Sequence, residues 1–177
     1  FKNIEYNIAF IKDKMAQSSI SSGRNPEDVR LMAVTKTVEP IFINHALKQG
    51  IDLIGENKVQ ELCAKQEATN YDLEWHLIGH LQRNKVRQLL KHNVAMIHSV
   101  DSERLAMEIE KEAAKLDKNV DILVEINIGN EESKSGFTPE SLREALEMAS
   151  TLPGIFVRGL MAIPPICEDE AVLRKYL

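Results

Sequence analysis

The hydrophobic residues of this chain fall into short runs that are separated by polar segments. In the first 19 residues the apolar positions recur at helical spacing, at Ile4, Ile8, Ile11 and Met15. This spacing predicts an amphipathic helix over about residues 1–19, which we expect to be a lid or an outer packing element. The segment 21–26, which is rich in Ser, Gly and Pro, ends the helix.

Six further apolar runs predict buried strands, over residues 29–35, 51–54, 74–78, 95–100, 120–128 and 155–163. The segments between them predict helices over residues 40–48, 58–68, 84–92, 102–116 and 139–150. Marker residues of successive strands, from Val34 in the first to Leu160 in the sixth, lie 19 to 34 residues apart. Such intervals are typical of β/α units, and they predict a parallel sheet.

Two architectures fit this alternation, an open doubly wound sheet and a (β/α)8 barrel. A dinucleotide-binding open sheet needs a Gly-rich turn after its first strand, whereas residues 35–40 contain no glycine. This favours an α/β fold of the TIM-barrel type. Six strands cannot close a barrel of eight, so we expect the chain to lack about two β/α units and to have two unpaired strand edges.

Composition narrows the range of functions. The chain has 177 residues, so we expect a single domain over 1–177, and its net charge of -5 gives no general reason to bind nucleic acid or an anionic membrane. No apolar run approaches the roughly 20 residues that span a bilayer. The two cysteines, Cys63 and Cys167, have no metal-binding spacing. We therefore expect buried free thiols in a reducing, cytoplasmic location.

The candidate for chemistry is Lys36, which follows the first predicted strand between Thr35 and Thr37. The carboxyl ends of parallel strands face the functional crevice of an α/β protein. Partial desolvation there can lower the pKa of an amine and leave it free to condense with an aldehyde. The alternative is an ordinary surface lysine just past the end of a strand.

Three other polar clusters follow predicted strands: Glu56-Asn57, His76 with residues 80–82, and residues 133–136. In a barrel all of them face one rim together with Lys36, which makes them one candidate site. Each has a simpler interpretation. Asn57 could cap the next helix, His76 could be a satisfied core histidine, and Lys134 could be a loop charge.

Five segments in order resemble the successive signatures of the YggS/PROSC family of pyridoxal phosphate homeostasis proteins. They are Ala33 to Lys36, Gly55 to Glu61, Trp75 to Lys85, Ser133 to Gly136 and Gly159 to Pro164. The resemblance implies a barrel similar to the N-terminal domain of bacterial alanine racemase, of fold-type III. It also implies that pyridoxal 5'-phosphate (PLP) is held as a Schiff base on Lys36.

The resemblance further suggests the residues around the cofactor. Asn57 and His76 are candidate neighbours of the PLP ring, Met161 could pack near it, and Lys134 is the competing amine. Family members continue past the sixth strand with a Ser-Met-Gly-Met-Ser-like and an Arg-x-Gly-like segment that anchor the phosphate. Neither segment follows Ile166, so the phosphate contacts are not assigned.

The family is implicated in intracellular PLP (vitamin B6) and amino-acid homeostasis, without an established catalytic activity. We therefore expect a monomeric, non-catalytic PLP-binding protein that limits free PLP and delivers it to apo-PLP enzymes. One alternative is a PLP-dependent amino-acid racemase, which requires a second base from an additional β domain that we do not see. Another is an interaction scaffold in which the lysine is incidental.

Overall fold

The computed structural model describes residues 1–69, 73–131 and 134–176. Residue contacts divide the chain into two units, residues 1–76 and 77–177, which are described separately below. Among the described residues, no helix is both long and apolar enough to cross a membrane.

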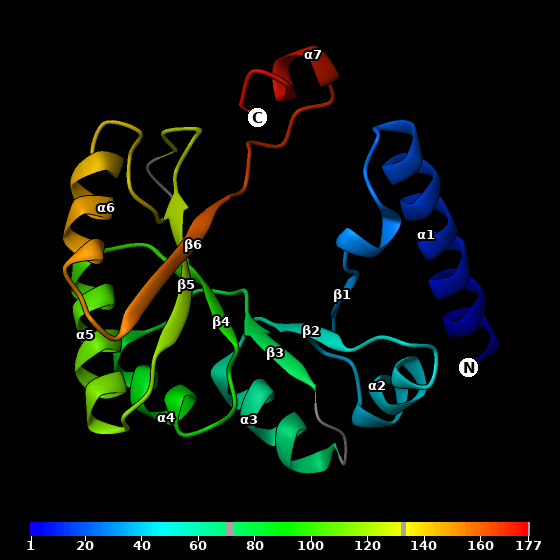
Figure 1. Cartoon of the computed structure of the whole chain (residues 1–177), viewed down its shortest axis with the longest axis horizontal. Helices are drawn as coiled ribbons and strands as arrows, with labels where there is room; N and C mark the ends of the chain where they lie inside the picture. Colours follow the sequence, from blue (N-terminus) through cyan, green and yellow to red (C-terminus); the bar gives the residue numbers. More distant parts are fainter. Residues whose placement is uncertain (70–72, 132–133, 177) are drawn as a thin grey trace. The chain divides into compact units, whose positions relative to one another are not determined.

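The first unit alternates helices and strands in the predicted order (Figure 1). Its elements are α1 (Lys2–Ser21), the 3-10 helix η1 (Pro26–Asp28), β1 (Met32–Val34), α2 (Pro40–Leu47), β2 (Leu53–Glu56), α3 (Val59–Ala68) and β3 (Glu74–Leu77), whose last residue belongs to the second unit. Strands β1 and β2 are parallel, and Ala33 lies beside Ile54. Strand β3 follows β2 in the sheet. All four residues of β2 are buried, as expected for a parallel strand covered on both faces.

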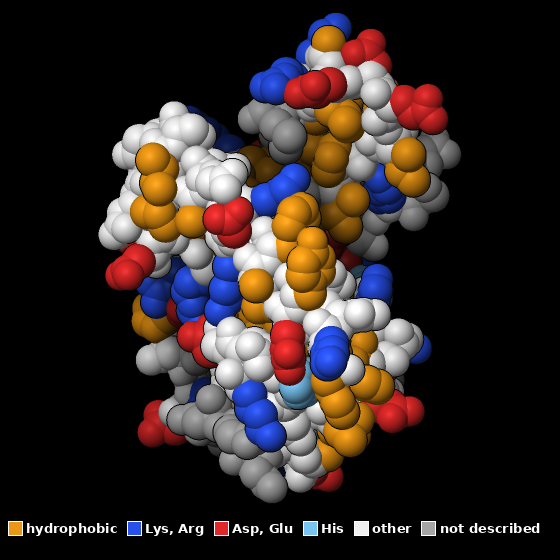
Figure 2. Space-filling view, turned by 90° about the vertical axis from the view of Figure 1, so that its right-hand side faces the viewer, with side chains coloured by type: hydrophobic (Ala, Val, Ile, Leu, Met, Phe, Trp, Pro, Cys, Tyr) orange, Lys and Arg blue, Asp and Glu red, His pale blue; other side chains and the backbone are white. Residues whose placement is uncertain are grey.

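Helix α1 is a packing element on α2, one of the two roles predicted for it. Lys12 Nζ donates to the carbonyl oxygens of Gln49 and Gly50, both at 2.9 Å, just after the end of α2. Gly50 ends that helix at a φ of 74°, as its position in the sequence predicts. Most of α1 is exposed, and hydrophobic side chains stand among charges on the face that carries it (Figure 2).

The second unit contains three parallel strands, β4 (Met96–Val100), β5 (Val120–Ile126) and β6 (Ile155–Ala162), in that order. Its helices are η2 (Arg83–Lys85), α4 (Val86–Leu90), α5 (Glu103–Lys115), α6 (Leu142–Ser150) and α7 (Glu170–Leu173). Helices α5 and α6 lie side by side over one face of β5 and β6 (Figure 1).

Strand β5 shows why this unit has a core on one face. Every second residue from Val120 to Ile126 is buried, and the residues between them are half-buried. The buried set meets the apolar sides of the two helices, to which Leu105, Ile109 and Ala145 belong. The opposite face of the strand therefore carries Asp121, Leu123 and Glu125.

All six predicted strands and six predicted helices occur in place, but several ends differ. The first strand is only Met32–Val34, and Arg30 upstream of it forms ion pairs with Glu74 and Asp52. Helix α6 begins at Leu142 instead of residue 139, since Thr138 and Ser141 hold a turn through hydrogen bonds between hydroxyls and backbone amides. The short elements η1 and α7 have no counterpart in the prediction.

The two cysteine thiols differ in their exposure to solvent. Both cysteines are free, as predicted, but only Cys63 is buried, whereas Cys167 is half-buried. Burial raises the pKa of the Cys63 thiol, and the nearby Glu67 adds to the effect.

Candidate functional site

Lys36 lies on a tight turn directly after β1. The Val38 amide donates to the Thr35 carbonyl oxygen at 2.9 Å, which closes a four-residue turn with Lys36 and Thr37 at its centre. Thr37 has a φ of 63°, a conformation in which Gly or Asn is usual. The turn presents the Lys36 side chain to solvent, where it is exposed.

A buried ion pair underlies this turn. Glu56, at the end of β2, is fully buried, and its Oε1 lies 2.6 Å from Lys65 Nζ. The Thr35 hydroxyl donates to the same oxygen at 2.6 Å, and Lys65 Nζ also donates to the Thr35 carbonyl oxygen at 2.7 Å. The residue before Lys36 is therefore fixed by both its side chain and its backbone.

The residue after Lys36 is held from the same helix. Glu61 Oε2 accepts from the Thr37 amide at 3.0 Å and from Lys65 Nζ at 3.2 Å. The hydrogen bond from Thr37 is the main cause that holds the pKa of Glu61 below its ordinary value, with Lys65 adding to it. Lys36 thus stands between two anchored threonines.

The amine of Lys36 itself is available. Within the described ranges, residues 1–69, 73–131 and 134–176, its Nζ has no hydrogen bond or ion pair. An accessible, unpaired primary amine on a rigid turn has the chemistry that a Schiff-base cofactor needs. The residues present at this position therefore fit such a group.

Asn57 follows the end of β2 as Lys36 follows the end of β1. Val34 pairs with Gly55 in the parallel register, and Lys36 and Asn57 each follow two residues later. Both residues therefore follow the carboxyl ends of neighbouring parallel strands, β1 and β2. Asn57 is half-buried and does not cap α3, because Lys58 occupies the N-cap position.

His76 lies within β3, not after it, and is buried. Its Nε2 lies 2.9 Å from Glu74 Oε1, and Arg30 donates to Glu74 Oε2 at 2.7 Å. Arg30 is the main cause that holds the pKa of Glu74 below its ordinary value, and His76 contributes. The buried His76 therefore has a carboxylate partner, as its interpretation as a satisfied core histidine requires.

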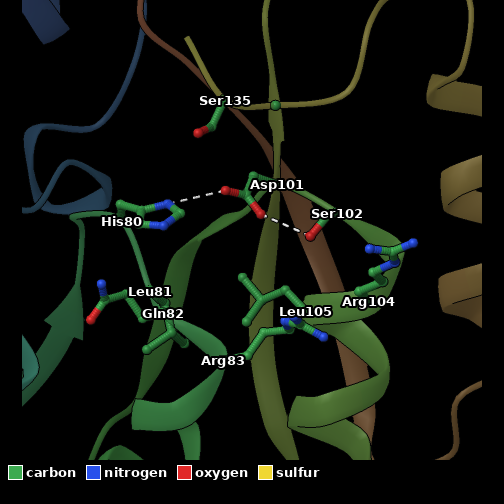
Figure 3. A pocket seen from close by; sticks show the side chains of 10 residues that line it. His80, Leu81, Gln82, Arg83, Asp101, Ser102, Arg104, Leu105 and Ser135 are labelled. Atoms are coloured by element: carbon green, nitrogen blue, oxygen red, sulfur yellow. Dashed lines mark hydrogen bonds and ion pairs between the residues drawn. The ribbon is translucent and has the colours of Figure 1, made fainter. Parts of the chain in front are cut away.

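In the second unit, the segments 80–83, 101–105 and 135–136 line an open pocket of about 450 Å³ (Figure 3). His80 Nδ1 lies 3.1 Å from Asp101 Oδ2, and the Ser102 hydroxyl donates to Asp101 Oδ1 at 3.0 Å. Asp101 therefore fixes both neighbours. His80, Gln82 and Ser135, which the sequence places after strands, do line one pocket.

Met161 and Glu125 lie side by side on β6 and β5. Met161 is half-buried. Desolvation raises the pKa of Glu125, and the charge of Asp101 raises it further. The one signal that singles out Glu125 in the sequence is its position as a carboxylate inside the most apolar predicted strand.

Lys134, the competing amine, is already paired. Its Nζ lies 2.6 Å from Glu131 Oε1. Ser133 of the same motif lies outside the described residues. In the described part of the chain no group of His, Cys, Asp and Glu side chains could hold a metal ion.

Sequence reasoning missed Lys65 and Glu61 as partners of the Lys36 turn. Their spacing of four residues on α3 is a weak signal of an ion pair on a helix. The sequence pattern predicts Glu56 as a polar residue after a strand, whereas it is the last residue of β2 and is buried.

Comparisons with known proteins agree with these features. A family model described as the alanine racemase N-terminal domain matches residues 2–176. The pyridoxal phosphate homeostasis protein of Aquifex aeolicus (strain VF5) is 41% identical over 170 residues, which are 96% of this chain and 74% of that protein.

Two solved structures are also similar. A protein of unknown function from Bifidobacterium adolescentis matches with a TM-score of 0.90 and 35% identity, over 99% of this chain and 75% of the other. PipY of Synechococcus elongatus PCC7942, with PLP bound, matches with a TM-score of 0.75 and 34% identity, over 91% and 76% of the two chains.

These matches confirm the α/β fold and the family that the five sequence motifs predict. The chain belongs to the family of pyridoxal phosphate homeostasis proteins, which have the fold of the alanine racemase N-terminal domain.

Proposed function

We propose that this protein binds PLP through a reversible Schiff base on Lys36 and serves PLP and amino-acid homeostasis as a carrier, without catalysis. The observation that carries the proposal is the unpaired, exposed amine of Lys36 on a turn anchored at both ends. The PLP-bound structure of the relative PipY supports it.

When bound, PLP supplies an aldehyde. Lys36 would hold the cofactor through its Nζ, by a condensation that forms a C=N bond and releases the aldehyde oxygen as water. Addition of water reverses the step, so Lys36 can release the cofactor unchanged. This reversibility is what a carrier requires.

The neighbours of the cofactor ring are also part of the proposal. Asn57 has the strongest support, because it follows the end of β2 as Lys36 follows the end of the neighbouring strand β1. His76 and Met161 remain proposed contacts of the ring. His76 also forms a hydrogen bond with Glu74, which gives it a structural role besides the proposed one. Recipients would be apo-PLP enzymes in the cytosol, with the protein acting as a monomer.

The visible spectrum of the full-length protein with PLP tests the proposal. We expect a Schiff-base absorbance band in the wild type and its loss in Lys36→Ala. Lys58→Ala is the matched control, because Lys58 is another exposed lysine of the same unit and follows β2 as Lys36 follows β1. An unchanged band in Lys36→Ala would show that another amine, with Lys134 the first to examine, holds PLP.

Addition of single amino acids separates the carrier from a racemase. A carrier leaves the amino acids without product and without isotope exchange at Cα. Exchange at Cα by the wild type, absent in Lys36→Ala, would replace the carrier by an enzyme.

A further inference from the structure

The turn that carries Lys36 contains a strained residue. Thr37 is β-branched and has a φ of 63°, a region in which its Cβ crowds the backbone. A residue persists in such a conformation only where the surrounding structure enforces it, and such residues cluster at functional sites. The positive φ of Thr37 therefore requires neighbouring groups that hold the turn.

Two side chains of α3, Glu61 and Lys65, bond the backbone of this turn. Glu61 accepts the Thr37 amide at 3.0 Å, and Lys65 donates to the Thr35 carbonyl oxygen at 2.7 Å. The two side chains also bond one another at 3.2 Å. One turn of α3 therefore holds the residues on both sides of Lys36.

The ion pair beneath them is costly to bury. Glu56 is fully buried and Lys65 is 7% exposed. Replacing such a pair by apolar residues is often neutral or stabilising, so stability alone does not explain it. Glu56 Oε2, moreover, has no hydrogen-bond partner within the described residues. A buried carboxylate with one unsatisfied oxygen lowers the free energy of unfolding, so a gain in stability does not account for Glu56.

We propose that Glu61 and Lys65, backed by Glu56, are positioning residues that hold the backbone around Lys36 in its strained turn, so that the amine is presented to the aldehyde of PLP. The inference rests on the proposed function, because it assigns the network a role in binding at Lys36. It places these residues behind the turn, with no contact to the cofactor.

The test compares three substitutions in the full-length protein. Glu61→Ala removes the acceptor of the Thr37 amide, Glu61→Gln keeps an acceptor oxygen, and Glu67→Ala makes the same change at an exposed position of the same helix. We expect Glu61→Ala to raise the dissociation constant for PLP roughly 10-fold. Glu61→Gln should recover most of the affinity, and Glu67→Ala should bind PLP like the wild type.

A second experiment tests whether relief of the backbone strain at residue 37 restores the binding of PLP. Glycine adopts a positive φ without steric cost. The double variant Thr37→Gly/Glu61→Ala should therefore bind PLP more tightly than Glu61→Ala alone. A structural role limited to stability predicts no such recovery.

A readout on the cofactor-free protein separates this inference from the proposed function. The Thr37 amide should exchange its hydrogen faster in Glu61→Ala than in the wild type or Glu67→Ala, as measured by NMR. If the wild type forms no band with PLP, the proposed function fails. If Glu61→Ala keeps both slow exchange and full affinity, the positioning role is wrong.

Discussion

Lys36 and Lys65 carry the same amine in opposite surroundings. Lys36 is exposed and unpaired within the described residues, whereas Lys65 is buried with three oxygen partners. A lysine that donates to two carboxylates and a carbonyl has no lone pair for nucleophilic attack. At the scale of single residues, the proposed reactive amine and the buried, hydrogen-bonded amine thus belong to different lysines.

The buried pair predicts an asymmetry between single and double substitutions. Lys65→Met leaves the Glu56 carboxylate buried without its cation, so we expect it to lower the free energy of unfolding by about 3–5 kcal/mol. Glu56→Gln/Lys65→Met removes both charges and should cost clearly less. Urea denaturation of the three proteins measures the difference, and a single variant as stable as the double one would contradict the assignment.

The individual site residues could be predicted only in part. Lys36 and Asn57 follow apolar runs in the sequence, so their place at strand ends could be inferred from the pattern alone. The partners of Thr35 could not, because Glu56 and Lys65 lie 21 and 30 residues away and a single sequence gives no pairing between distant charges.

At the scale of elements, the strands were the most predictable part because their apolar runs stand out from the polar segments between them. The prediction that all six are buried was wrong for β1 and β6, which are only partly buried. The ends of helices were less predictable, since side chains outside the hydrophobic pattern decide them. Residues 83–85 form the 3-10 helix η2, and α4 is reduced to Val86–Leu90 although the pattern predicts a helix over 84–92. Local hydrogen bonds of turns, invisible to periodicity, explain the start of α6 in the same way.

The attachment of α1 gives a prediction at this scale. Lys12 supplies two hydrogen bonds to carbonyl groups after the end of α2, so Lys12→Ala should lower the free energy of unfolding by about 0.5–1.5 kcal/mol. Lys2→Ala, an exposed lysine at the start of the same helix, is the control and should have little effect. Urea denaturation measures the free energy of unfolding of both variants. An equal decrease in the two would show that Lys12 does not hold α1 against the segment after α2.

At the scale of the whole molecule, paired carboxylates set the response to acid. The pKa values of Glu61, Glu74 and Glu112 are lowered in the fold, mainly by the Thr37 amide, Arg30 and Lys115 respectively. Such groups stabilise the fold above their unfolded pKa of about 4.3, and this contribution is lost as the pH falls through the folded pKa. Glu125, with its raised pKa, acts in the opposite sense.

We therefore expect the free energy of unfolding to fall as the pH is lowered from 5 to 3. Urea denaturation at several pH values measures it. Glu74→Gln should show a shallower fall, because glutamine does not take up a proton. A free energy of unfolding that stays constant over this range would mean that these ion pairs do not stabilise the fold.

The fold class was accessible from sequence because six apolar runs at intervals of β/α units leave few arrangements open. The ordered motifs then identified the family, and the matches over 96% and 99% of the chain confirm it. The division of contacts at residue 76 had no counterpart in composition, since no linker rich in Gly or Pro marks it.

Within each unit the strands lie in the order in which they occur in the chain. During synthesis, each new strand that leaves the ribosome can therefore pair with the strand made just before it. Because each strand pairs with its predecessor in the chain, only short loops have to close. Closure of long loops is what slows the assembly of parallel sheets. The turn that carries Lys36 can be fastened as soon as α3 has emerged, long before synthesis ends.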